Sequence, residues 1–322
     1  MERNITIIAA CDRNGCIGKN GQVPWRLAED MKIFRELTTD YPVIMGRKTY
    51  ESLPSTFRPL PGRQNIVITK QNDLDYGDGV TVVQSWEYAL ASAEADKHIF
   101  VIGGADIFRL ALSEAKRIIL TSVQTTVESG DIFMSELISL TLPWHKVASV
   151  SHPQDKNNEH DFNLEVWHRQ GYPMTETFYL NSSRYVDQLI RMLTIMSEGI
   201  CSFCPEHITR FHKGEIVGQT NHWQVVVNGW PYEGTKVHWL IIPKEHLTDL
   251  TQISQEAWLE FGPIINNLVQ AHNLTGYSVF CRSGEMKKTS ATVAHLHFHL
   301  LSGQGQDDGG KPIKVKLGFD KL

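Results

Sequence analysis

The first half of the chain alternates short runs of apolar and β-branched residues with segments in which apolar residues recur every three or four positions. Such runs are typical of buried strands, and the longer spacing is typical of surface helices. Strands are predicted at residues 5–10, 41–46, 65–69, 79–83, 98–104 and 117–123, and helices at 28–38, 85–95 and 105–115. The alternation predicts an α/β domain with a mostly parallel sheet flanked by helices. Segments 143–152 and 161–169 should close that sheet as an antiparallel hairpin.

The second half has a different order of elements. Helices are predicted at 183–199 and 254–273, and strands at 221–229, 236–246, 276–284 and 294–303. This order predicts an α+β domain, an antiparallel sheet with helices. The polar segment 169–183 contains glycine, proline, serine and threonine, as connections between domains often do. We therefore expect a first domain at residues 1–169, a linker at 170–180 and a second domain at 181–322.

Composition narrows the classes of function. The chain has 322 residues, of which 41% are apolar and 21% charged, as in ordinary globular proteins. Its net charge of -5 argues against broad electrostatic binding to nucleic acid or to an anionic membrane. No apolar run approaches the roughly 18–20 residues of a membrane span, and the N-terminal apolar run is too short for a signal peptide. We expect a cytoplasmic protein that binds neither nucleic acid nor membrane.

Two glycine turns in the first half are candidate phosphate sites. One lies between a predicted strand and a predicted helix, and the other lies between a strand and a basic helix start. Glycine permits close approach of a phosphate, and a helix N-terminus supplies N–H groups. The residues are Gly103 and Gly104 in the first turn, and Gly46, Arg47, Lys48 and Thr49 in the second. A tight turn without a ligand and a solvated basic turn remain the alternatives.

Asp30 lies in the first turns of the predicted helix 28–38, where Met31 and Phe34 share its face. A carboxylate at this position is usually a favourable charge at a helix N-terminus. The alternative is a buried carboxylate that binds the amidine-like edge of a heterocycle through two charge-assisted hydrogen bonds.

Four segments in the first half together resemble dihydrofolate reductases over residues 1–169: "IGKNGQVPWRLAEDMKIFRELT", "PVIMGRKTYESL", "RPLPGRQNIVIT" and "VIGGADIF". The resemblance implies NADPH-dependent reduction of dihydrofolate to tetrahydrofolate. It implies that Asp30 holds the pterin's amino-pyrimidine edge and supports protonation at N5, and that Trp25 fixes a water beside it. A riboflavin-pathway reductase of the same fold is the alternative, and the run "PWRLAED" favours the folate enzyme.

The resemblance also implies which residues contact the two ligands. Arg63 would pair with the substrate's glutamate carboxylate, and Lys70 would reach the 2′-phosphate of NADPH. The other substrate-contacting residues would be Ile8, Met31, Phe34, Ile102 and Thr121. The other residues that contact NADPH would be Ala10, Ile17, Gly46, Arg47, Lys48, Thr49, Gly103, Gly104 and Ala105.

Three histidines alternate with apolar residues in the predicted strand 294–303. On a strand, His295, His297 and His299 would share one face while the residues between them pack behind. Such a group favours either a metal cluster or nucleophilic catalysis at phosphorus by a neutral imidazole.

A CxxC pair, Cys201 and Cys204, is the second feature of this half. Together with His238 and His246 it could form a closed tetrahedral zinc site. A redox pair is the alternative, but the surrounding sequence has no thioredoxin-like pattern.

The segments "HLHFHLL" and "VNGWPYEGTKVHWLIIPKEHL" resemble the histidine-triad (HIT) family of nucleotide hydrolases and transferases over about residues 180–305. The resemblance implies that His297 attacks the α-phosphorus and becomes nucleotidylated, while His238 and His299 position the reacting groups. Thr292 stands where relatives carry a serine that contacts phosphate or leaving group, and Asn228 lies near a ribose-binding position. By the same resemblance, zinc would be bound by Cys201, Cys204, His246 and His295. The segment "CRSG" at 281–284 departs from relatives, which often have asparagine before the glycine.

Three interpretations of the second half stay open. It is a nucleotide hydrolase or transferase acting through His297, a nucleotide-binding module without turnover, or a zinc-stabilised dimerisation module. The last follows from the tendency of HIT relatives to form homodimers. The expected ligands of the whole chain are dihydrofolate, NADPH, zinc, and a nucleotide or nucleotide conjugate.

Overall fold

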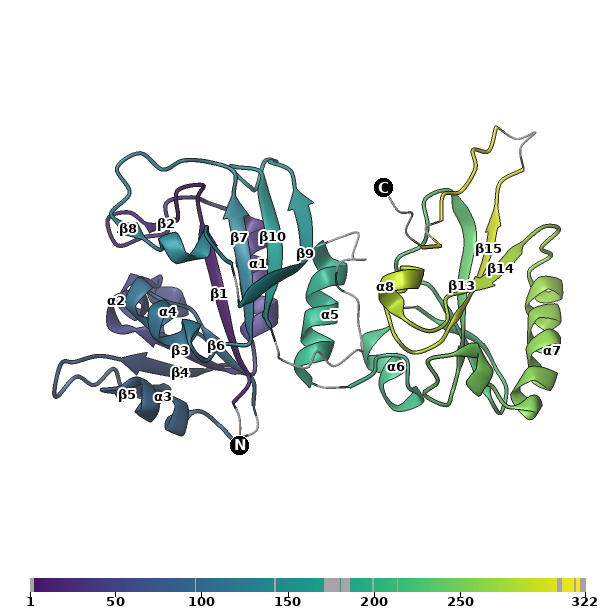
Figure 1. Cartoon of the computed structure of the whole chain (residues 1–322), viewed down its shortest axis with the longest axis horizontal. Helices are drawn as coiled ribbons and strands as arrows, with labels where there is room; N and C mark the ends of the chain where they lie inside the picture. The colour runs from purple at the N-terminus through teal and green to yellow at the C-terminus, as the bar shows by residue number, and fades with distance from the viewer. Residues whose placement is uncertain are drawn as a thin grey trace. The chain divides into compact units, whose positions relative to one another are not determined.

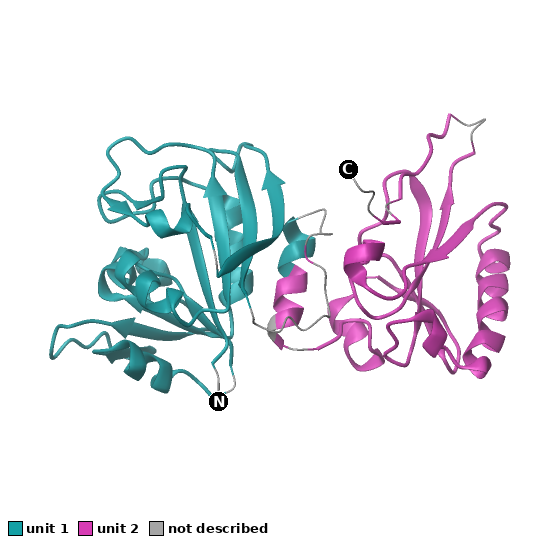
Figure 2. Ribbon diagram, viewed as in Figure 1, with its two compact units in different colours: residues 1–173, 184–190 teal, residues 174–183, 191–322 magenta. Residues whose placement is uncertain are grey.

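The computed structural model describes residues 3–95, 97–141, 143–170, 180, 186–198, 200–212, 214–305, 309–315, 317 and 318. The chain divides into two compact units, which are coloured separately in Figure 2. Unit 1 comprises residues 1–173 and 184–190, and unit 2 comprises residues 174–183 and 191–322. Most of the predicted linker at 170–180 lies outside the described residues, so its boundaries stay a prediction.

Unit 1 is built on an eight-stranded sheet (Figure 1). In spatial order its strands are β5 (Val80–Val83), β4 (Gln64–Ile68), β3 (Pro42–Gly46), β6 (Ile99–Val101), β1 (Ile5–Cys11), β7 (Arg117–Val123), β10 (Phe162–Arg169) and β9 (Trp144–His152). The pairs from β5 to β7 are parallel. Strand β10 pairs antiparallel with both β7 and β9. The predicted parallel sheet with a closing antiparallel hairpin is therefore confirmed.

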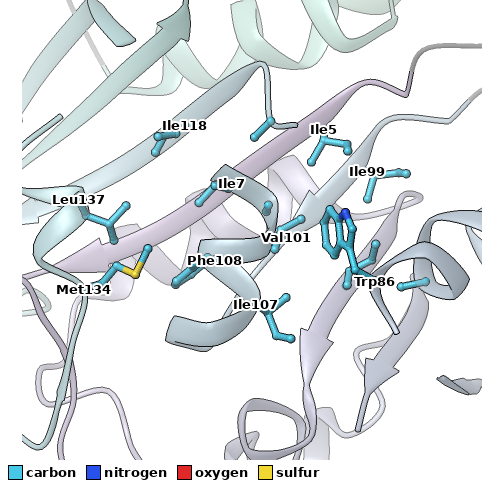
Figure 3. Packing of buried hydrophobic residues seen from close by; sticks show 14 of the residues in the cluster. Ile5, Ile7, Trp86, Ile99, Val101, Ile107, Phe108, Ile118, Met134 and Leu137 are labelled. Atoms are coloured by element: carbon cyan, nitrogen blue, oxygen red, sulfur yellow. The ribbon is translucent and has the colours of Figure 1, made fainter. Parts of the chain in front are cut away.

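Helices pack through two separate clusters of buried side chains in unit 1. The larger cluster joins β1, β6 and β7 to α3 (Trp86–Ser92) and α4 (Ala105–Leu112). Figure 3 shows its centre, where Phe108 of α4 lies near Ile7 and Val101, and Ile107 belongs to the same cluster. The smaller cluster joins β3 and β4 to Phe34 of α1 (Ala28–Thr38) and to Tyr50 of α2 (Arg47–Ser52). The remaining elements are η1 (Ser55–Phe57), η2 (Ser135–Leu137) and the paired strands β2 (Cys16–Gly18) and β8 (Ile132–Phe133).

Unit 2 contains a five-stranded antiparallel sheet. In spatial order its strands are β11 (Ile216–Gln219), β12 (Trp223–Val227), β13 (Thr235–Pro243), β15 (Phe298–Gly303) and β14 (Ser278–Cys281). One face packs against α7 (Gln255–Ala271), and the other against α6 (Pro205–Phe211). The other helices are α5 (Val186–Glu198), which the division into units splits after Ile190, η4 (Leu250–Gln252) and α8 (Met286–Thr289). The predicted antiparallel sheet with helices is confirmed.

The main correction concerns the strand predicted at 294–303. Strand β15 begins only at Phe298, so His295 and His297 lie before it and only His299 is a strand residue. The alternation still holds, because Leu296, Phe298 and Leu300 all enter the core beneath α7.

Other predicted elements are shorter in the structure than in the sequence prediction. Strand β6 ends at Val101, because the chain turns at the glycines that follow, and α3 and α4 end three residues before their predicted limits. The sequence prediction missed β2, β8, α6, β11 and α8. Within the described residues, no helix has both the length and the apolar character needed to cross a membrane.

Candidate active sites

Asp30 meets Thr121 in unit 1. Asp30 lies in the first turn of α1, and Thr121 is a buried residue of β7. The Thr121 hydroxyl donates a hydrogen bond to Asp30 Oδ1 at 2.5 Å. Burial raises the pKa of the Asp30 carboxyl to about 6, although the hydrogen bond from Thr121 acts in the opposite direction. A carboxyl group with this pKa can exchange a proton near neutral pH.

The loop between β9 and β10 holds the start of α1. Asn158 accepts a hydrogen bond from the backbone of Glu29 through its side-chain oxygen at 3.0 Å. The carbonyl of Asn157 accepts from the backbone of Ala28 at 3.2 Å. These contacts fix Asp30, and the sequence prediction missed them because they join segments more than 100 residues apart.

The predicted substrate residues of unit 1 are of three kinds. Ile8 and Trp25 are buried, and the Trp25 Nε1–H is buried without a hydrogen-bond partner among the described residues. Phe34 and Ile102 are half-buried, and both pack against the cluster that contains Tyr50. Met31 differs, since 61% of its surface is exposed.

Arg63 is anchored by three hydrogen bonds. Its Nε donates to Thr38 Oγ1 at 2.8 Å, its Nη1 to the carbonyl of Pro61 at 2.7 Å, and its Nη2 to the carbonyl of Arg35 at 3.3 Å. The guanidinium carbon lies 5.6 Å from the centre of the Phe34 ring. The cation is thus held at a fixed place beside an aromatic side chain from α1.

The structure brings the two predicted glycine turns together. The N–H of Gly46 donates to the carbonyl of Gly103 at 2.7 Å. Gly46 caps α2 and Gly104 caps α4, and neither helix has a side-chain hydrogen bond at its N-cap. A Cβ on Gly104 would lie 3.3 Å from Thr49 Oγ1. Two helix N-termini therefore lie close together, and neither has a hydrogen bond from a side chain at its N-cap.

The surrounding predicted residues lie at or near the surface. Arg47 pairs with Glu51 at 2.7 Å, and Lys48 and Lys70 are exposed. The half-buried residues of this set are Ala10, Ile17, Thr49 and Ala105.

Four predicted metal ligands converge in unit 2. The ligand atoms of Cys201, Cys204, His246 and His295 all lie within 4.8 Å of one another. His295 Nδ1 lies 3.3 Å from Cys201 Sγ and 3.7 Å from Cys204 Sγ, and His246 Nδ1 lies 3.4 Å from Cys204 Sγ. Bond lengths of about 2.3 Å to sulfur and about 2.0–2.1 Å to nitrogen give tetrahedral edges of about 3.5 Å. The three sulfur–nitrogen distances match such edges, so the four side chains are placed to hold a zinc ion after small adjustments.

A backbone carbonyl fixes the tautomer of His295. Its Nε2 donates a hydrogen bond to the carbonyl of Pro243 at 2.9 Å. In the neutral ring this leaves the lone pair on Nδ1, the nitrogen that faces the two thiols.

His297 is held by the backbone of the preceding histidine. Its Nδ1 donates to the carbonyl of His295 at 2.8 Å, which leaves the lone pair on Nε2. Burial lowers the pKa of His297 to about 4, so the ring is neutral at physiological pH. Phe203 packs edge-on against this ring, with 5.1 Å between ring centroids. A buried, neutral and oriented imidazole is suited to nucleophilic attack.

His299 and His238 form a pair beside His297. His238 Nε2 lies 2.8 Å from His299 Nδ1, and the rings of His297 and His299 lie 4.9 Å apart. Asn228 accepts from the backbone of Trp230 at 3.0 Å, so its amide nitrogen faces His238, at 3.1 and 3.3 Å from the two ring nitrogens.

Two aromatic residues stack on the histidine group, and Thr292 precedes it in the chain. Thr292 is half-buried, three residues before His295. Tyr232 and Phe280 stack on His238 and His299, with ring centroids 5.0 and 4.6 Å apart. Sequence reasoning did not single out these two aromatic residues, because nothing in their spacing relates them to the histidines.

Comparisons with known proteins divide the chain in the same way. Residues 4–169 match the family model for dihydrofolate reductase, and residues 211–306 match that for the HIT domain. The chain is 46% identical over 133 residues to a dihydrofolate reductase of Neisseria gonorrhoeae, which is 41% of this chain and 80% of the relative. It is 44% identical over 121 residues to the enzyme of Mycobacterium leprae, which is 38% of this chain and 73% of the relative. Among solved structures it resembles "Dihydrofolate reductase from Enterococcus faecalis complexed with NADP(H) and RAB-propyl", with 32% identity, a TM-score of 0.46, and coverage of 52% of this chain and 98% of that one.

Proposed function

The chain belongs to the dihydrofolate reductase family and carries a HIT domain, and on that basis we propose that unit 1 reduces 7,8-dihydrofolate to tetrahydrofolate with NADPH. The observation that carries the proposal is the carboxyl group of Asp30, enclosed at the start of α1 with a pKa of about 6 and held by Thr121. The sequence "PWRLAED", which contains Asp30, and the matches to dihydrofolate reductases both favour the folate reaction over that of a riboflavin-pathway reductase.

Asp30 and its neighbours would bind the pterin. The ionised carboxylate accepts hydrogen bonds from the amino-pyrimidine edge, and its proton affinity supports protonation at N5. The Trp25 Nε1–H, buried without a partner among the described residues, supports the expectation that a water molecule lies beside Asp30. Arg63, with its orientation fixed by three acceptors, would bind the glutamate carboxylate at the far end of the substrate.

The glycine turns fit the phosphates of NADPH. Gly46 and Gly104 leave the N-termini of α2 and α4 without side-chain caps, and both helix dipoles favour an anion there. Arg47, Lys48 and Thr49 supply charge and a hydroxyl at the same place, and Lys70 is exposed for the 2′-phosphate. NADPH supplies the hydride that reduces C6 of the pterin.

The reductase proposal is tested by turnover of dihydrofolate in the full chain. We expect NADPH oxidation to depend on dihydrofolate, and Asp30→Asn to lower kcat by about 100-fold or more because it removes the proton-exchanging group. Glu29→Gln is the matched control, since Glu29 is the adjacent carboxylate and pairs with Lys32. Equal loss in both variants, or activity only with the pyrimidine substrate of the riboflavin pathway, would overturn the assignment.

For unit 2 we propose nucleotide hydrolysis or transfer through His297. The His297 Nε2 lone pair attacks the α-phosphorus, a P–N bond forms, and the bond to the leaving group breaks with its electron pair. Water then cleaves the P–N bond and releases the nucleotide. The supporting observation is the hydrogen bond from His297 Nδ1 to the carbonyl of His295, because it fixes the nucleophilic tautomer.

We further propose that zinc binds Cys201, Cys204, His246 and His295. The donor distances and the tautomer of His295 support it. Four protein ligands leave no open position, so the ion would stabilise the fold and would not contact the substrate.

A nucleotidyl–protein adduct tests the second activity. The full chain would be mixed with adenosine phosphoramidate or diadenosine triphosphate and the reaction quenched rapidly. The mass of the intact protein would then be measured by mass spectrometry. We expect a nucleotidyl mass increase and released nucleotide, both absent in His297→Ala. Nucleotide binding without an adduct or turnover would favour the alternative, a non-catalytic binding or dimerisation module.

A further inference from the structure

Glu51 is an exposed residue of α2 whose two carboxylate oxygens hold two different partners. Arg47 Nη1 donates to Glu51 Oε2 at 2.7 Å, and Tyr76 Oη donates to Glu51 Oε1 at 2.8 Å. These hydrogen bonds, from Tyr76 first and then from Arg47, lower the pKa of the Glu51 carboxyl, so the group is ionised at neutral pH. We call the two contacts the Glu51 bridge.

The Glu51 bridge attaches a long loop to α2. Tyr76 belongs to the loop at residues 69–79, between β4 and β5, and its ring packs on that of Tyr50 of α2 with centroids 4.4 Å apart. Tyr50 is buried, and Tyr76 packs against the same cluster of apolar side chains. Arg58 Nη1 donates to the carbonyl of Glu51 at 2.9 Å, which also holds the backbone of α2 at this point. Tyr76 thus joins the loop to α2 through one apolar and one polar contact.

Each of the two joined segments carries a basic residue at the same edge of the sheet. Arg47 follows Gly46, the last residue of β3, and Lys70 comes two residues after Ile68, the last residue of β4. The two strands are parallel, and Gly46 is in register with Ile68. Arg47 and Lys70 therefore leave the sheet at one edge. The function proposed for unit 1 assigns both to NADPH, with Lys70 at the 2′-phosphate.

Arg47 keeps donors for a ligand while Glu51 holds it. A guanidinium has five N–H groups in one plane, and Glu51 accepts from Nη1 alone. The Nε and Nη2 atoms of Arg47 donate to no residue in the part of the chain that the structure describes, and 28% of the side chain is exposed. A side chain or a loop that is fixed before binding loses less conformational entropy when the ligand arrives. The Glu51 bridge should therefore strengthen the binding of an anion by Arg47 and Lys70.

We propose that Glu51 and Tyr76 are positioning residues for coenzyme selection: they hold Arg47 and the loop that carries Lys70 in place for the 2′-phosphate, so that unit 1 prefers NADPH to NADH. The inference rests on the proposed function of unit 1. NADH has no 2′-phosphate, so loss of the Glu51 bridge weakens the binding of NADPH and leaves that of NADH almost unchanged. A purely structural role of Glu51 would weaken the binding of both coenzymes alike.

Steady-state kinetics of the full chain with the two coenzymes test the selection. We expect Glu51→Ala to raise the KM for NADPH by about 3- to 10-fold, as for loss of an exposed ion pair and a charge-assisted hydrogen bond. The kcat with NADPH should stay the same, and the KM for NADH should change by less than about 2-fold, because neither depends on the 2′-phosphate. Glu51→Gln should restore part of the loss, since its amide oxygen can accept from Arg47 and its NH2 group can donate to Tyr76 Oη.

The matched control is Glu94→Ala. Glu94 is an exposed carboxylate of the same unit and pairs with Lys97 at 2.7 Å. This variant should leave the KM for both coenzymes unchanged. Equal losses with NADPH and NADH in Glu51→Ala, or a lower KM for NADPH, would overturn the selection.

Tyr76→Phe separates the two contacts of the Glu51 bridge. It removes the hydroxyl and keeps the ring packed on Tyr50. The KM for NADPH should rise by about 2- to 5-fold, as for loss of one hydrogen bond to a charged group at an exposed site. Adding Tyr76→Phe to Glu51→Ala should cause no further rise, because both changes remove the same contact. Additive effects would mean that Tyr76 acts independently of Glu51, and would contradict the bridge.

A binding measurement separates the Glu51 bridge from the reduction of dihydrofolate. The fluorescence of NADPH and of NADH, titrated with the full chain in the absence of dihydrofolate, gives the two dissociation constants. The wild-type chain should bind NADPH at least about 10-fold more tightly than NADH, and Glu51→Ala should lower this ratio by about 3- to 10-fold. Unchanged circular dichroism shows that the variant is folded, and Glu51→Gln and Tyr76→Phe are measured in its place if it is not.

The outcomes distinguish the Glu51 bridge from the proposed activity. If the preference for NADPH depends on Glu51 but dihydrofolate is not reduced, the proposed activity is wrong and the bridge stands. If dihydrofolate is reduced but the wild-type chain binds both coenzymes equally, the activity stands and the bridge is overturned. A preference that Glu51→Ala leaves unchanged, or binding of neither coenzyme, also overturns the bridge.

Discussion

The Thr121 hydroxyl on β7 donates to the Asp30 carboxylate on α1 at 2.5 Å, and this one contact opposes the effect of burial on the pKa of the carboxyl. Burial disfavours the charged form, whereas a hydrogen bond to that form favours it. The pKa of about 6 is the result of both effects. The balance can be changed without removing the carboxyl group itself.

Thr121→Val keeps the shape of the side chain and removes the donor. The pKa of Asp30 should rise further, by about 1–2 units, since a hydrogen bond to a charged group contributes roughly 1.5–3 kcal/mol. If protonated Asp30 is the active form, kcat/KM of the reductase falls as pH rises through that pKa, and the midpoint moves upward in the variant. Ser122→Ala, on the next position of β7, is the control. A midpoint that stays in place or moves downward would contradict the role of Thr121.

Asp30→Asn should increase stability while it reduces activity. Burial raises the pKa of the Asp30 carboxyl in the folded protein from its ordinary value of 3.8 to about 6, so the wild-type protein loses stability as pH rises through this interval and the loss persists above it. Asparagine carries no charge and still accepts from Thr121. The variant should exceed the wild type by on the order of 1–3 kcal/mol at about pH 8 and match it at about pH 4. Urea unfolding at both pH values measures this difference, and a variant less stable at the higher pH would refute the burial argument.

Gly103→Ala should destabilise unit 1 for two reasons. Gly103 has φ +107°, and a Cβ there would lie 3.0 Å from Phe108 Cζ. We expect a loss of about 1–3 kcal/mol in urea unfolding, together with weaker NADPH binding. Gly21→Ala is the matched control, because Gly21 also has positive φ but no atom within 4 Å of the added Cβ. The same loss in both variants would mean that the backbone conformation alone, and not the contact with Phe108, causes the loss of stability.

Cys204→Ser should remove zinc from unit 2. Elemental analysis should find stoichiometric zinc in the wild-type chain and little in the variant, and a strong chelator should lower the thermal midpoint of the wild type only. Cys281→Ser is the control, since Cys281 is a half-buried cysteine outside the ligand cluster. A fully folded, metal-free wild type would exclude the site.

The elements with strong local patterns were predictable from the sequence. Helix α1 has the predicted bounds, and α7 starts where Ser254 accepts from the backbone of Ala257. The strand with three histidines was predicted too long because alternation alone cannot distinguish a strand from an extended segment. Here the residues before Phe298 make other contacts: His295 bonds to Pro243, and its carbonyl accepts from His297.

Candidate site residues could be predicted from the sequence where they belong to short sequence motifs. The four candidate metal ligands converge as the family resemblance implied. Residue types and spacing alone had suggested His238 as a ligand, and the structure places it against His299 instead. Arg282 lies in the segment "CRSG" that departs from relatives, but a single arginine in a predicted strand does not indicate that its Nη1 lies 3.0 Å from His299 Nε2. Its relation to His299 arises only from the pairing of β14 with β15, a tertiary contact.

The order of strands in unit 1 has a consequence for biosynthesis. Strand β1 pairs with β6 and β7. Ile5 can therefore pair with Ile99, and Thr6 with Arg117, only after these later residues have left the ribosome. The eight strands of that sheet nevertheless all come from residues 5–169, before any strand of unit 2 is translated. Domains generally fold as units during synthesis, the N-terminal one first. The sheet of unit 1 can thus close on the nascent chain while the histidine group is still untranslated, and a chain terminated between the two would still contain every strand of that sheet.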